Sequence, residues 1–357
     1  MSKVHNFSAG PCILPQEVFK EASEALINFD NLGLSVIEIS HRSPSFVAVM
    51  EEARSLVKEL LEVPEGYSVL FLGGGASTGF LTVAYNMIRE NKRAAYIDTG
   101  AWANKASKEV TYVGEMDIVG SSIDKNYSYI PKNIQAGSEY DYLHFTSNNT
   151  ISGTQFKANP DVNIPLVCDM SSDIFSKKIN VADFDIIYAG AQKNMGPAGT
   201  TLYIVKDEIL GKSSVQVPTM LDLNTHVKKD SMFNTPPVFP VYASMLNLRW
   251  LKKNGGVSWI EKINEQKATL LYNEIDSNPL FVGPNAIEDR SNMNATFLLT
   301  NEELTDTFNS MWNEANISGI KGHRSVGGYR ASMYNALPLE SVQTLVNVMQ
   351  ELAQKHG

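Results

Sequence analysis

Apolar residues recur at helical spacing in two segments near the beginning of the chain. The segment 15–29, PQEVFKEASEALINF, mixes apolar and charged residues and opens with proline, which is favoured in the first turn of a helix. In the segment 45–61, the apolar residues fall on one helical stripe. The stripe consists of Phe46, Val49, Met50, Ala53, Leu56, Val57, Leu60 and Leu61. The pattern therefore predicts two amphipathic helices, each with one face turned to a core.

Short apolar runs that are typical of buried strands follow these helices. They occupy residues 68–72, 94–98, 142–146, 165–168, 185–189 and 201–205. Several are separated by stretches long enough for a crossover helix, which a pair of parallel strands requires. The order of elements therefore predicts an α/β fold with a mainly parallel central sheet. In such folds, ligands bind in the loops at the carboxyl ends of the strands.

The pattern changes near residue 255. Gly255 and Gly256 form a pair that suits the end of a helix and a domain boundary. The elements predicted beyond this pair are a long polar helix, a strand at 295–299, a helix at 302–316, a strand at 329–333 and a last helix with Val342, Leu345, Val346, Met349 and Leu352 aligned. We therefore expect a large domain over 16–256 and a smaller α+β domain formed by 1–15 and 257–357.

The composition is that of an ordinary globular protein. The chain has 357 residues, of which 43% are hydrophobic, and a formal net charge of −9. A nucleic-acid-binding surface needs a basic stripe, so this charge argues against such a partner. No apolar run approaches the roughly 18 residues of a membrane span, and the start of the chain has no secretory pattern, so we expect a cytoplasmic protein. Cys12 and Cys168 are too few for a thiolate metal site, and we expect both to be buried and unreactive.

One lysine stands in an unusual setting. The stretch 186–205, IIYAGAQKNMGPAGTTLYIV, places Lys193 among small residues between two apolar segments. A solvated lysine on a turn is the ordinary interpretation of such a residue. Here, however, the glycines and alanines leave room for a ligand, and the lysine follows a strand that we expect to be buried. An amine in that position is a candidate for Schiff-base formation with a carbonyl group.

A run of glycines follows the first predicted strand. Residues 73–79, GGGASTG, lead from this strand into a helical pattern. The free N–H groups and the dipole of a helix N-terminus attract anions, so the loop is a candidate phosphate cradle. No Lys-Ser or Lys-Thr follows the glycines, which argues against a nucleotide-binding P-loop, and the spacing is not that of a dinucleotide fingerprint. A tight turn without a ligand is the alternative.

Three further residues stand at predicted strand ends. Asp169 follows the apolar run at 165–168, where a carboxylate is costly unless it has a partner. An aspartate in this position can keep the ring nitrogen of pyridoxal phosphate protonated. Trp102 can stack on a flat ring or simply pack, and Thr150 offers a hydroxyl group. Together with Lys193 and the glycine loop, these residues supply the groups that pyridoxal 5′-phosphate needs.

Several stretches resemble one enzyme family. They are NFSAGPCILP, GLSVIEISHRSPSF, AGAQKNMGPAGT, SMFNTPPVFPVY, KGHRSVGGYRASMYNALP and the final helix ending in KHG. Across essentially the whole chain, they resemble the phosphoserine aminotransferases, which are class-V, fold-type I enzymes that use pyridoxal phosphate. The resemblance implies that Lys193 carries the cofactor and that Asp169 contacts its ring nitrogen. The other implied cofactor contacts are Trp102 on the ring, Thr150 on the ring hydroxyl, and Gln192, Ala76 and Ser77 on the phosphate.

The resemblance also implies a homodimer with shared active sites. The family uses an Asn-Thr pair to reach the cofactor phosphate of the neighbouring subunit, and this pair corresponds to Asn234 and Thr235. The implied substrate-binding residues are His41, Arg42, His323, Arg324 and Arg330. Arginine suits the capture of carboxylate and phosphate, although a surface salt-bridge cluster is the alternative for each segment alone. Many family members have an arginine where this chain has Ser77, so one source of positive charge is missing.

The activity that the resemblance implies is amino transfer from L-glutamate to 3-phosphohydroxypyruvate, which gives O-phospho-L-serine and 2-oxoglutarate in serine biosynthesis. Lys193 then moves the Cα proton of the substrate, while Asp169 keeps the cofactor ring protonated. A phosphorylated keto acid of pyridoxine biosynthesis, 3-hydroxy-2-oxo-4-phosphooxybutanoate, is a second acceptor to test.

Two other functions are alternatives at this point. One is another class-V enzyme, such as an alanine–glyoxylate-type transaminase or a cysteine desulfurase. The desulfurase needs a mobile nucleophilic cysteine, and neither Cys12 nor Cys168 is placed for that role. The other is a noncatalytic anion-binding module that uses the glycine loop, which predicts a colourless purified protein.

Overall fold

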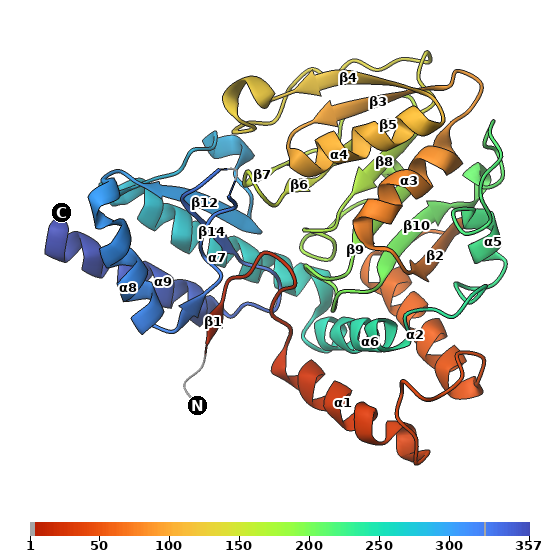
Figure 1. The fold of residues 1–357 in the computed structure, drawn as a ribbon, viewed down its shortest axis with the longest axis horizontal. Coiled ribbons are helices and arrows are strands. Elements are labelled where there is room, and N and C mark those ends of the chain that lie inside the picture. The colour runs from red at the N-terminus through yellow and green to blue at the C-terminus, as the bar shows by residue number, and fades with distance from the viewer. Residues whose placement is uncertain (1–3, 325) are drawn as a thin grey trace.

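The computed structural model describes residues 4–324 and 326–357 and is built around one large sheet (Figure 1). Within these residues, the sheet has seven strands in the order β2-β10-β9-β8-β5-β3-β4. The strands are β2 (Tyr67–Leu72), β3 (Arg93–Asp98), β4 (Glu115–Ser121), β5 (Leu143–Thr146), β8 (Leu166–Asp169), β9 (Ile186–Gly190) and β10 (Thr201–Lys206). The neighbouring pairs from β9 to β4 are parallel, whereas β10 is antiparallel to β2 and β9. The prediction of a mainly parallel sheet is confirmed.

The direction of the strands decides which loops meet. Because β10 is antiparallel to both of its neighbours, β2 points the same way as β9, β8, β5 and β3. The carboxyl ends of these strands therefore share one edge of the sheet. The apolar pattern does not predict β4, because this strand is exposed or half-buried along its length and carries polar residues. The other strands of the sheet lie within two residues of their predicted positions.

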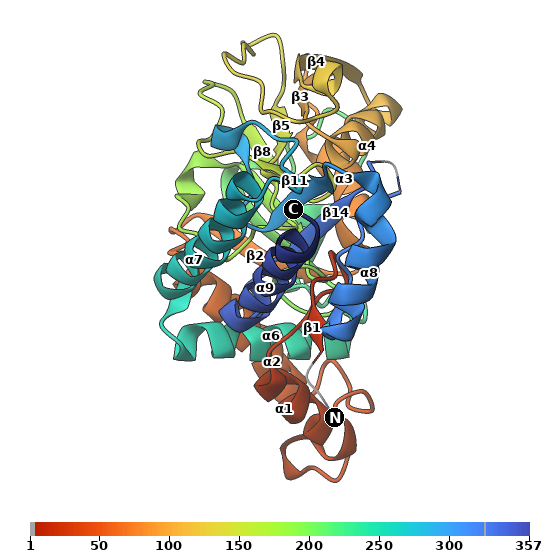
Figure 2. The same ribbon diagram turned by 90° about the vertical axis from the view of Figure 1, so that its left-hand side faces the viewer.

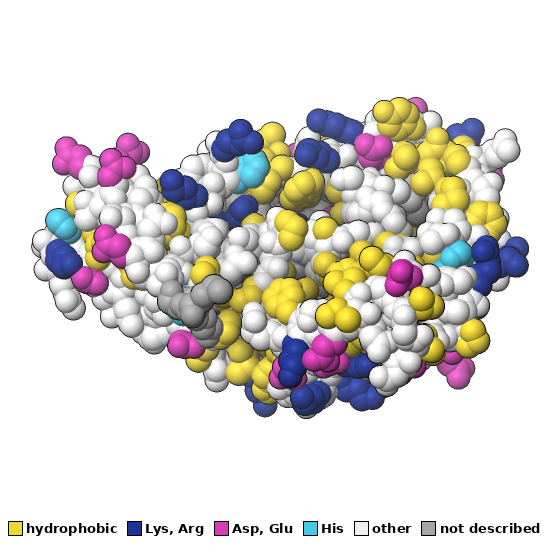
Figure 3. Space-filling view, turned by 60° about the horizontal axis from the view of Figure 1, so that its bottom comes forward, with side chains coloured by type: hydrophobic (Ala, Val, Ile, Leu, Met, Phe, Trp, Pro, Cys, Tyr) yellow, Lys and Arg dark blue, Asp and Glu magenta, His cyan; other side chains and the backbone are white. Residues whose placement is uncertain are grey.

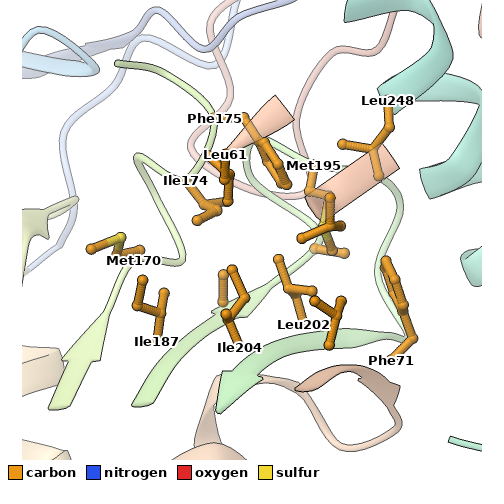
Figure 4. Close-up of a cluster of buried hydrophobic side chains, with 14 of the residues drawn as sticks. Leu61, Phe71, Met170, Ile174, Phe175, Ile187, Met195, Leu202, Ile204 and Leu248 are labelled. Atoms are coloured by element: carbon orange, nitrogen blue, oxygen red, sulfur yellow. The ribbon is translucent and has the colours of Figure 1, made fainter. Parts of the chain in front are cut away.

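Helices cover both faces of the sheet (Figures 1 and 2). The helices of this part are α1 (Gln16–Ile27), α2 (Pro44–Leu60), α3 (Gly75–Met87), α4 (Ala101–Glu109), α5 (Leu223–Val227) and α6 (Val238–Lys253). Side chains alternate along β2, so Leu70 joins the core beneath α3 and α4, whereas Phe71 joins the core beneath α2 and α6. Figure 4 shows part of the second core, where Ile187 and Leu202 from the sheet face Met195 and Leu248. Both faces of the sheet are therefore buried, as a parallel sheet requires.

The first helix in the structure is shorter than the helix predicted over 15–29. Helix α1 ends at Ile27, and Phe29–Asn31 forms a separate 3₁₀ turn in which Asp30 has a φ of 49°. The prediction of a helix over 15–29 is wrong at its end, because Asn28 has an extended backbone, with φ −154° and ψ 98°, which cannot continue a right-handed helix. Helix α2 is confirmed within one residue, and the Ser43 side chain caps it by accepting a hydrogen bond from the N–H of Phe46.

The C-terminal part has its own small sheet and core. Its elements are α7 (Gly256–Ser277), β11 (Phe281–Val282), β12 (Asn294–Leu299), α8 (Thr305–Glu314), β13 (Ile317–Ser318), β14 (Tyr329–Ser332) and α9 (Leu339–His356). The antiparallel sheet has the order β11-β12-β14. Helices α7, α8 and α9 pack against this sheet and share one core with it (Figure 2). The N-terminal strand β1 (His5–Asn6) pairs with β13, and Phe7 lies in the same core as residues of α7, α8 and α9.

The predicted helix at 302–316 is too long at both ends. A 3₁₀ turn, Glu302–Leu304, precedes α8, and the side chain of Asn301 accepts a hydrogen bond from the N–H of Glu303. After α8, Asn316 has a φ of 56°, which stops the helix. The other predicted C-terminal elements are confirmed within about one residue or one turn.

Buried amides join the two parts of the chain next to Lys193. Asn194 accepts a hydrogen bond from the N–H of Asn335 at 2.8 Å and donates one to the carbonyl of Ile174 at 2.6 Å. Asn264 of α7 donates to the Asn335 side chain at 2.9 Å. These bonds hold the backbone beside Lys193 between the large sheet and the C-terminal helices. In the described part of the chain, no helix is long and apolar enough to cross a membrane.

Candidate active site

The edge formed by the strand ends brings together residues that lie far apart in the sequence. Ala76 and Ser77 begin α3 after β2, and Trp102 begins α4 after β3. Thr150 follows the short strand β6 (Asn148–Asn149), which pairs with β7 (Thr154–Gln155). Asp169 ends β8, and Lys193 follows β9. The structure therefore places all of these predicted residues at one edge.

Lys193 is the centre of this group. Its Nζ donates a hydrogen bond to Oγ1 of Thr150 at 2.8 Å and lies 5.5 Å from the centroid of the Trp102 ring. Burial lowers the pKa of Lys193 to about 8, an effect that the charge of Arg330 reinforces and that of Asp169 opposes. An amine with this pKa is neutral far more often near neutral pH than an ordinary lysine. It can therefore act as a nucleophile toward a carbonyl group.

Asp169 is held in one orientation and has one oxygen to spare. The residue is only 3% exposed, and its Oδ1 accepts hydrogen bonds from the N–H and the hydroxyl of Ser171, at 2.8 and 2.5 Å. The hydroxyl of Ser171 in turn accepts a bond from the N–H of Gly190 at 3.0 Å. Burial raises the pKa of Asp169, while Lys193 and Ser171 act in the opposite direction. No described residue donates a hydrogen bond to Oδ2, so this oxygen can receive the N–H of a protonated ring.

The beginning of α3 is built to receive an anion. Its N-cap, Gly74, has no side-chain oxygen with which to satisfy the first N–H groups. A Cβ at Gly190 would lie 2.8 Å from Oε1 of Gln192 and 3.4 Å from the backbone nitrogen of Ala76. The missing side chain thus lets the Gln192 amide and the start of the helix approach one another. This arrangement fits a phosphate group, and together with the amine, the carboxylate and the indole it fits pyridoxal phosphate.

Arg330 lies beside these groups on β14. Its guanidinium donates a hydrogen bond to the carbonyl of Thr150 at 3.3 Å, while its buried Nε has no partner among the described residues. Burial lowers the pKa of Arg330, because the charged form loses solvent. Arg330 and His323 line a cavity of about 770 Å³, which is also lined by Ala101 and Ile151, the residues before Trp102 and after Thr150 in the sequence. Arg330 therefore connects this cavity with Thr150, the hydrogen-bond partner of Lys193.

Five of the residues predicted to bind substrate or to reach the neighbouring subunit do not line this cavity. His41 is buried and its Nε2 has no described partner, and its pKa is lowered by burial and by the neighbouring charge of Arg42, which is itself exposed. Asn234 and Thr235 are exposed in the segment before α6. Arg324 is also exposed, in the loop that leads to β14. A single chain therefore does not bring the complete predicted set together.

Sequence reasoning missed residues that hold the backbone and side chain of Lys193 in place. The N–H of Cys12 donates to the carbonyl of Gln192 at 3.1 Å, and its thiol donates to the carbonyl of Lys193. A Cβ at Gly10 would lie 3.3 Å from Cγ of Lys193, so only glycine fits without movement. Burial raises the pKa of Cys12 to about 12, which agrees with the expectation of an unreactive thiol. The expectation that both cysteines are buried is confirmed for Cys168 and is wrong for Cys12, which is only partly buried.

The signals for these residues differ. Ser171 stands two positions after Asp169, which is the spacing at which an aspartate side chain bonds the backbone ahead of it. That spacing could have revealed the support of Asp169. Nothing local relates Gly10 and Cys12 to Lys193, because the contact joins segments about 180 residues apart.

Comparisons with known proteins agree with this arrangement. Residues 4–345 match the family model described as aminotransferase class-V. The chain is 64% identical to the phosphoserine aminotransferase of Flavobacterium psychrophilum over 354 residues, which cover 99% of each protein. The solved phosphoserine aminotransferase of Bacillus circulans subsp. alkalophilus superposes with a TM-score of 0.96 at 43% identity, over 99% of each chain.

A related structure contains the cofactor that the site fits. The pyridoxal phosphate-bound phosphoserine aminotransferase of Trichomonas vaginalis superposes with a TM-score of 0.93 at 35% identity, over 98% of this chain and 100% of that one. Together with the full-length matches, the arrangement of Lys193, Asp169 and the α3 N-terminus leaves one assignment. The chain belongs to the class-V aminotransferase family, whose members depend on pyridoxal phosphate, and within it to the phosphoserine aminotransferases.

Proposed function

We propose that this enzyme transfers the amino group of L-glutamate to 3-phosphohydroxypyruvate and releases O-phospho-L-serine and 2-oxoglutarate. Full-length identity to phosphoserine aminotransferases supports this choice of substrates. The observation that carries it in the structure is the cavity lined by Arg330 and His323, whose charged lining residues among those described are all basic. Both substrates are anions with two acidic groups, so such a cavity suits them.

The roles of the residues follow from their positions. Bound pyridoxal phosphate supplies an electron sink for the bond that is broken at the substrate Cα. Lys193 holds the cofactor and, when released, takes and returns the proton at the substrate Cα, because its pKa of about 8 suits both steps. Asp169 keeps a proton on the ring nitrogen. Thr150 positions the Lys193 amine, and Trp102, whose ring centroid lies 5.5 Å from that amine, would contact the cofactor ring.

Arg330 is our choice for the α-carboxylate of the substrate. It is half-buried, its Nε lacks a described partner, and it lies beside Thr150, so it faces the centre of the site. His323 and Arg324 of the same chain, together with His41 and Arg42, are our choice for the distal acidic group. Ala76, Ser77 and Gln192 bind the cofactor phosphate.

The proposed substrate class is tested by the preference for O-phosphoserine over serine as amino donor in the reverse direction. A site built for a phosphate leaves its basic groups unpaired when serine binds. Two lost charge-assisted hydrogen bonds predict a kcat/KM ratio of about 10² to 10⁴ between the two donors. A ratio near one would contradict a phosphorylated substrate. Arg330→Gln should weaken both donors equally, because both have the α-carboxylate.

We also propose that the enzyme is a homodimer with shared sites. Apolar side chains are exposed on α1 and in the loop after it, with Ile27 at 81% and Ile37 at 61% exposure, and Figure 3 shows the side of the molecule that includes α1. A second copy that covers this surface would bury them. In that dimer, Asn234 and Thr235 reach the cofactor phosphate of the other subunit, which explains why they are exposed in one chain.

Mixed dimers test the shared site. A Lys193→Ala chain and an Asn234→Ala/Thr235→Ala chain are each inactive alone in this proposal. In a mixed dimer, one site regains every intact residue, so activity should return to about one site per dimer. Mixing two Lys193→Ala preparations with different tags is the matched control. A verified mixed dimer without activity would show that Asn234 and Thr235 act in their own chain.

The remaining proposals concern organisation and cellular role. We propose a large domain over 16–256 and a small domain formed by 1–15 and 257–357, and the separate C-terminal core that includes Phe7 supports this division. We further propose that the enzyme works in the cytoplasm and also aminates 3-hydroxy-2-oxo-4-phosphooxybutanoate for pyridoxine biosynthesis. An assay with that keto acid as acceptor tests the second activity.

A further inference from the structure

The small antiparallel sheet of the C-terminal part has one apolar and one polar face. Side chains alternate along its strands, and those on one face, such as Phe297 and Ala331, lie in the C-terminal core. On the opposite face, two pairs of residues stand side by side on β12 and β14. These four residues, which we call the polar face, are Asn294 beside Ser332 and Thr296 beside Arg330. Polar groups that are buried on this face need hydrogen-bond partners in another part of the chain.

The partners lie in the segment 148–152, which includes β6 and lies next to β12 (Figure 1). Every second residue of this segment forms a hydrogen bond with the polar face. The bonds join Asn148 to Asn294 at 2.8 Å, Thr150 to Arg330 at 3.3 Å and Ser152 to Thr296 at 3.2 Å. The middle residue, Thr150, is the one whose hydroxyl accepts the hydrogen bond of Lys193. The small sheet therefore holds the segment on both sides of the residue that contacts the reactive amine.

Asn148 is fully engaged in this contact. It is 1% exposed, and its two side-chain N–H bonds are directed at the Asn294 side chain and at the hydroxyl of Ser172, each at 2.8 Å. Its side-chain oxygen accepts a hydrogen bond from the hydroxyl of Ser291. Ser172 stands three residues after Asp169, in the turn that follows β8. Because both donors of the amide are used, Asn148 is held in one orientation between the two parts of the chain.

Asn294 continues the contact toward Arg330. It is 0% exposed, and its side-chain oxygen accepts the bond from Asn148. Its N–H bonds are directed at the hydroxyls of Ser332 and Tyr334, at 2.9 and 3.3 Å. Ser332 stands two residues after Arg330 on β14, so both side chains project from the same face of the strand. Asn294 therefore connects Asn148 with the strand that carries Arg330.

The energetics of buried amides favour a single arrangement of these segments. A buried amide that loses its partner is left without water and without a protein hydrogen bond, which costs more than the bond itself contributes. Displacing segment 148–152 from β14 would leave Asn148 and Asn294 in that state. The bond between them therefore fixes the spacing between the Lys193 amine, which Thr150 holds, and the Arg330 guanidinium.

We propose that Asn148 and Asn294, which we call the amide bridge, are positioning residues that hold Arg330 at a fixed place relative to Lys193. They act through segment 148–152 and through β14. The inference rests in part on the proposed function, because there Arg330 binds the α-carboxylate of the substrate. A fixed spacing lets an amino acid place its carboxylate at Arg330 and its amino group near Lys193 without a prior rearrangement of the two parts of the chain.

The first measurement uses the cofactor-free full-length chain. Only the neutral amine of Lys193 attacks the cofactor, so the pH midpoint of cofactor uptake reports the pKa of this amine. The positive charge of Arg330 lowers that pKa, whereas the charges of Asp169 and Asp173 raise it. Asn294→Ala changes no charge. If it releases Arg330 from its place, the midpoint should rise, as it should in Arg330→Gln. In an Arg330→Gln background, Asn294→Ala should cause no further rise.

The second measurement uses the cofactor-loaded enzyme with O-phosphoserine and with serine as amino donors. Both donors have an α-carboxylate, so Asn294→Ala should raise both KM values by the same factor, about 3- to 10-fold, and should keep the visible absorption of the cofactor. Asn148→Ala should have a similar effect. The double variant should lose little more than either single variant, because the two side chains share one hydrogen bond. Ser332→Ala removes a single bond to Asn294 and should give a smaller rise, which keeps the test decisive if Asn294→Ala does not fold.

Asn278 provides a matched control. It is 7% exposed, and its side chain donates hydrogen bonds to Glu274 and to the carbonyl of Met349 at 2.7 and 3.2 Å, within the C-terminal part. Asn278→Ala should lower the melting temperature as Asn294→Ala does, since each removes a buried amide with several partners. It should leave the uptake midpoint and both KM values at their wild-type values.

Three results would overturn the inference. A wild-type uptake midpoint in Asn294→Ala, with a raised midpoint in Arg330→Gln, would show that the amide bridge does not place Arg330. Equal rises of KM in Asn294→Ala and Asn278→Ala would show that lost stability accounts for the effect. If Arg330→Gln changes neither the midpoint nor KM, Arg330 has no role that the bridge could support. If Arg330→Gln changes only the midpoint, the proposed substrate contact of Arg330 fails, and the midpoint of Asn294→Ala still decides whether the bridge positions it.

Discussion

Two lysines inside this protein both have a lowered pKa but have different surroundings. Burial lowers the pKa of Lys193 to about 8 and that of Lys267 to about 7. Lys267 lies in the middle of α7, is 0% exposed, and donates hydrogen bonds to the carbonyls of Met333 and Tyr334 at 2.9 and 2.8 Å. Lys193 is only partly buried and bonds a single hydroxyl, that of Thr150.

A lowered pKa alone therefore does not separate the lysine of the proposed site from a structural lysine. Lys267 ties α7 to the backbone after β14, and its hydrogen atoms are directed at fixed carbonyls. Lys193 lies near the Asp169 carboxylate, the Trp102 ring and the N-terminus of α3, and each of these groups can still contact a ligand. A lysine whose neighbouring groups can still bind a ligand is a candidate for reaction, whereas a lysine whose donors are all used by the backbone is structural.

The largest effect should come from removing the reactive amine. Lys193→Ala should lose nearly all turnover and the visible absorption band that depends on the covalent bond to the cofactor. The melting temperature of the cofactor-free protein should change little, because among residues 4–324 and 326–357 the Lys193 side chain has a hydrogen bond only to Thr150. Absorbance, an activity assay and thermal unfolding check these outcomes. Normal turnover in this variant would remove Lys193 from its catalytic role.

A smaller loss of activity is expected when Lys193 is kept and Asp169 is substituted. Asp169→Asn should still bind the cofactor but lose at least about tenfold in kcat, because a neutral amide does not favour the protonated ring. Both hydrogen bonds from Ser171 can still be accepted by the amide oxygen. An unchanged kcat would mean that Asp169 serves only the structure of the strand end.

Lys267 should show the opposite pattern. Lys267→Met should retain the cofactor absorption and kcat, but it should lower the free energy of unfolding by about 1 to 3 kcal/mol, since two buried carbonyls lose their donor. Denaturant unfolding followed in parallel with activity separates the two effects. Loss of kcat without loss of stability would overturn the comparison.

The same variant predicts a pH dependence with a definite sign. Between the folded pKa of about 7 and the ordinary value of 10.5, the unfolded chain binds more protons at Lys267 than the folded chain does. The stability advantage of the wild type over Lys267→Met should therefore grow as pH rises, by up to about 1.4 kcal/mol per pH unit. Unfolding measured at pH 7.5 and at pH 9 would show no such growth if Lys267 titrates normally.

The smallest expected effect concerns the acidity of Lys193. Only the neutral amine attacks the cofactor, so the rate of cofactor uptake by the cofactor-free protein should rise with pH through about 8. Arg330→Gln should move this midpoint upward, because the positive charge of Arg330 lowers the pKa of Lys193. Comparing both proteins with the same cofactor cancels the titration of the cofactor itself. An identical midpoint would show that Arg330 has no electrostatic influence on Lys193.

Much of the fold and of the site could be predicted from local patterns. The apolar runs predicted six strands of the central sheet, because buried strands exclude polar residues whatever they pair with. Lys193, Asp169 and the glycine loop could be recognised because each follows such a run. The pattern failed at β4, which is an edge strand and half-buried, and at helix ends that depend on a single positive φ, such as that of Asn316.

The sequence by itself determined which segments become strands and helices and which chemical groups stand at the strand ends, because these depend on neighbours along the chain. Only the tertiary structure decided that β10 runs antiparallel to its neighbours and that Gly10 and Cys12 lie against Lys193. It also decided that Lys267 donates hydrogen bonds to two backbone carbonyls, whereas Lys193 donates to one hydroxyl. These facts depend on contacts between distant segments. Burial and hydrogen-bond partners determine the pKa of an amine and how many of its hydrogen-bond donors remain unused. An amine acquires this burial and these partners only when the chain has folded.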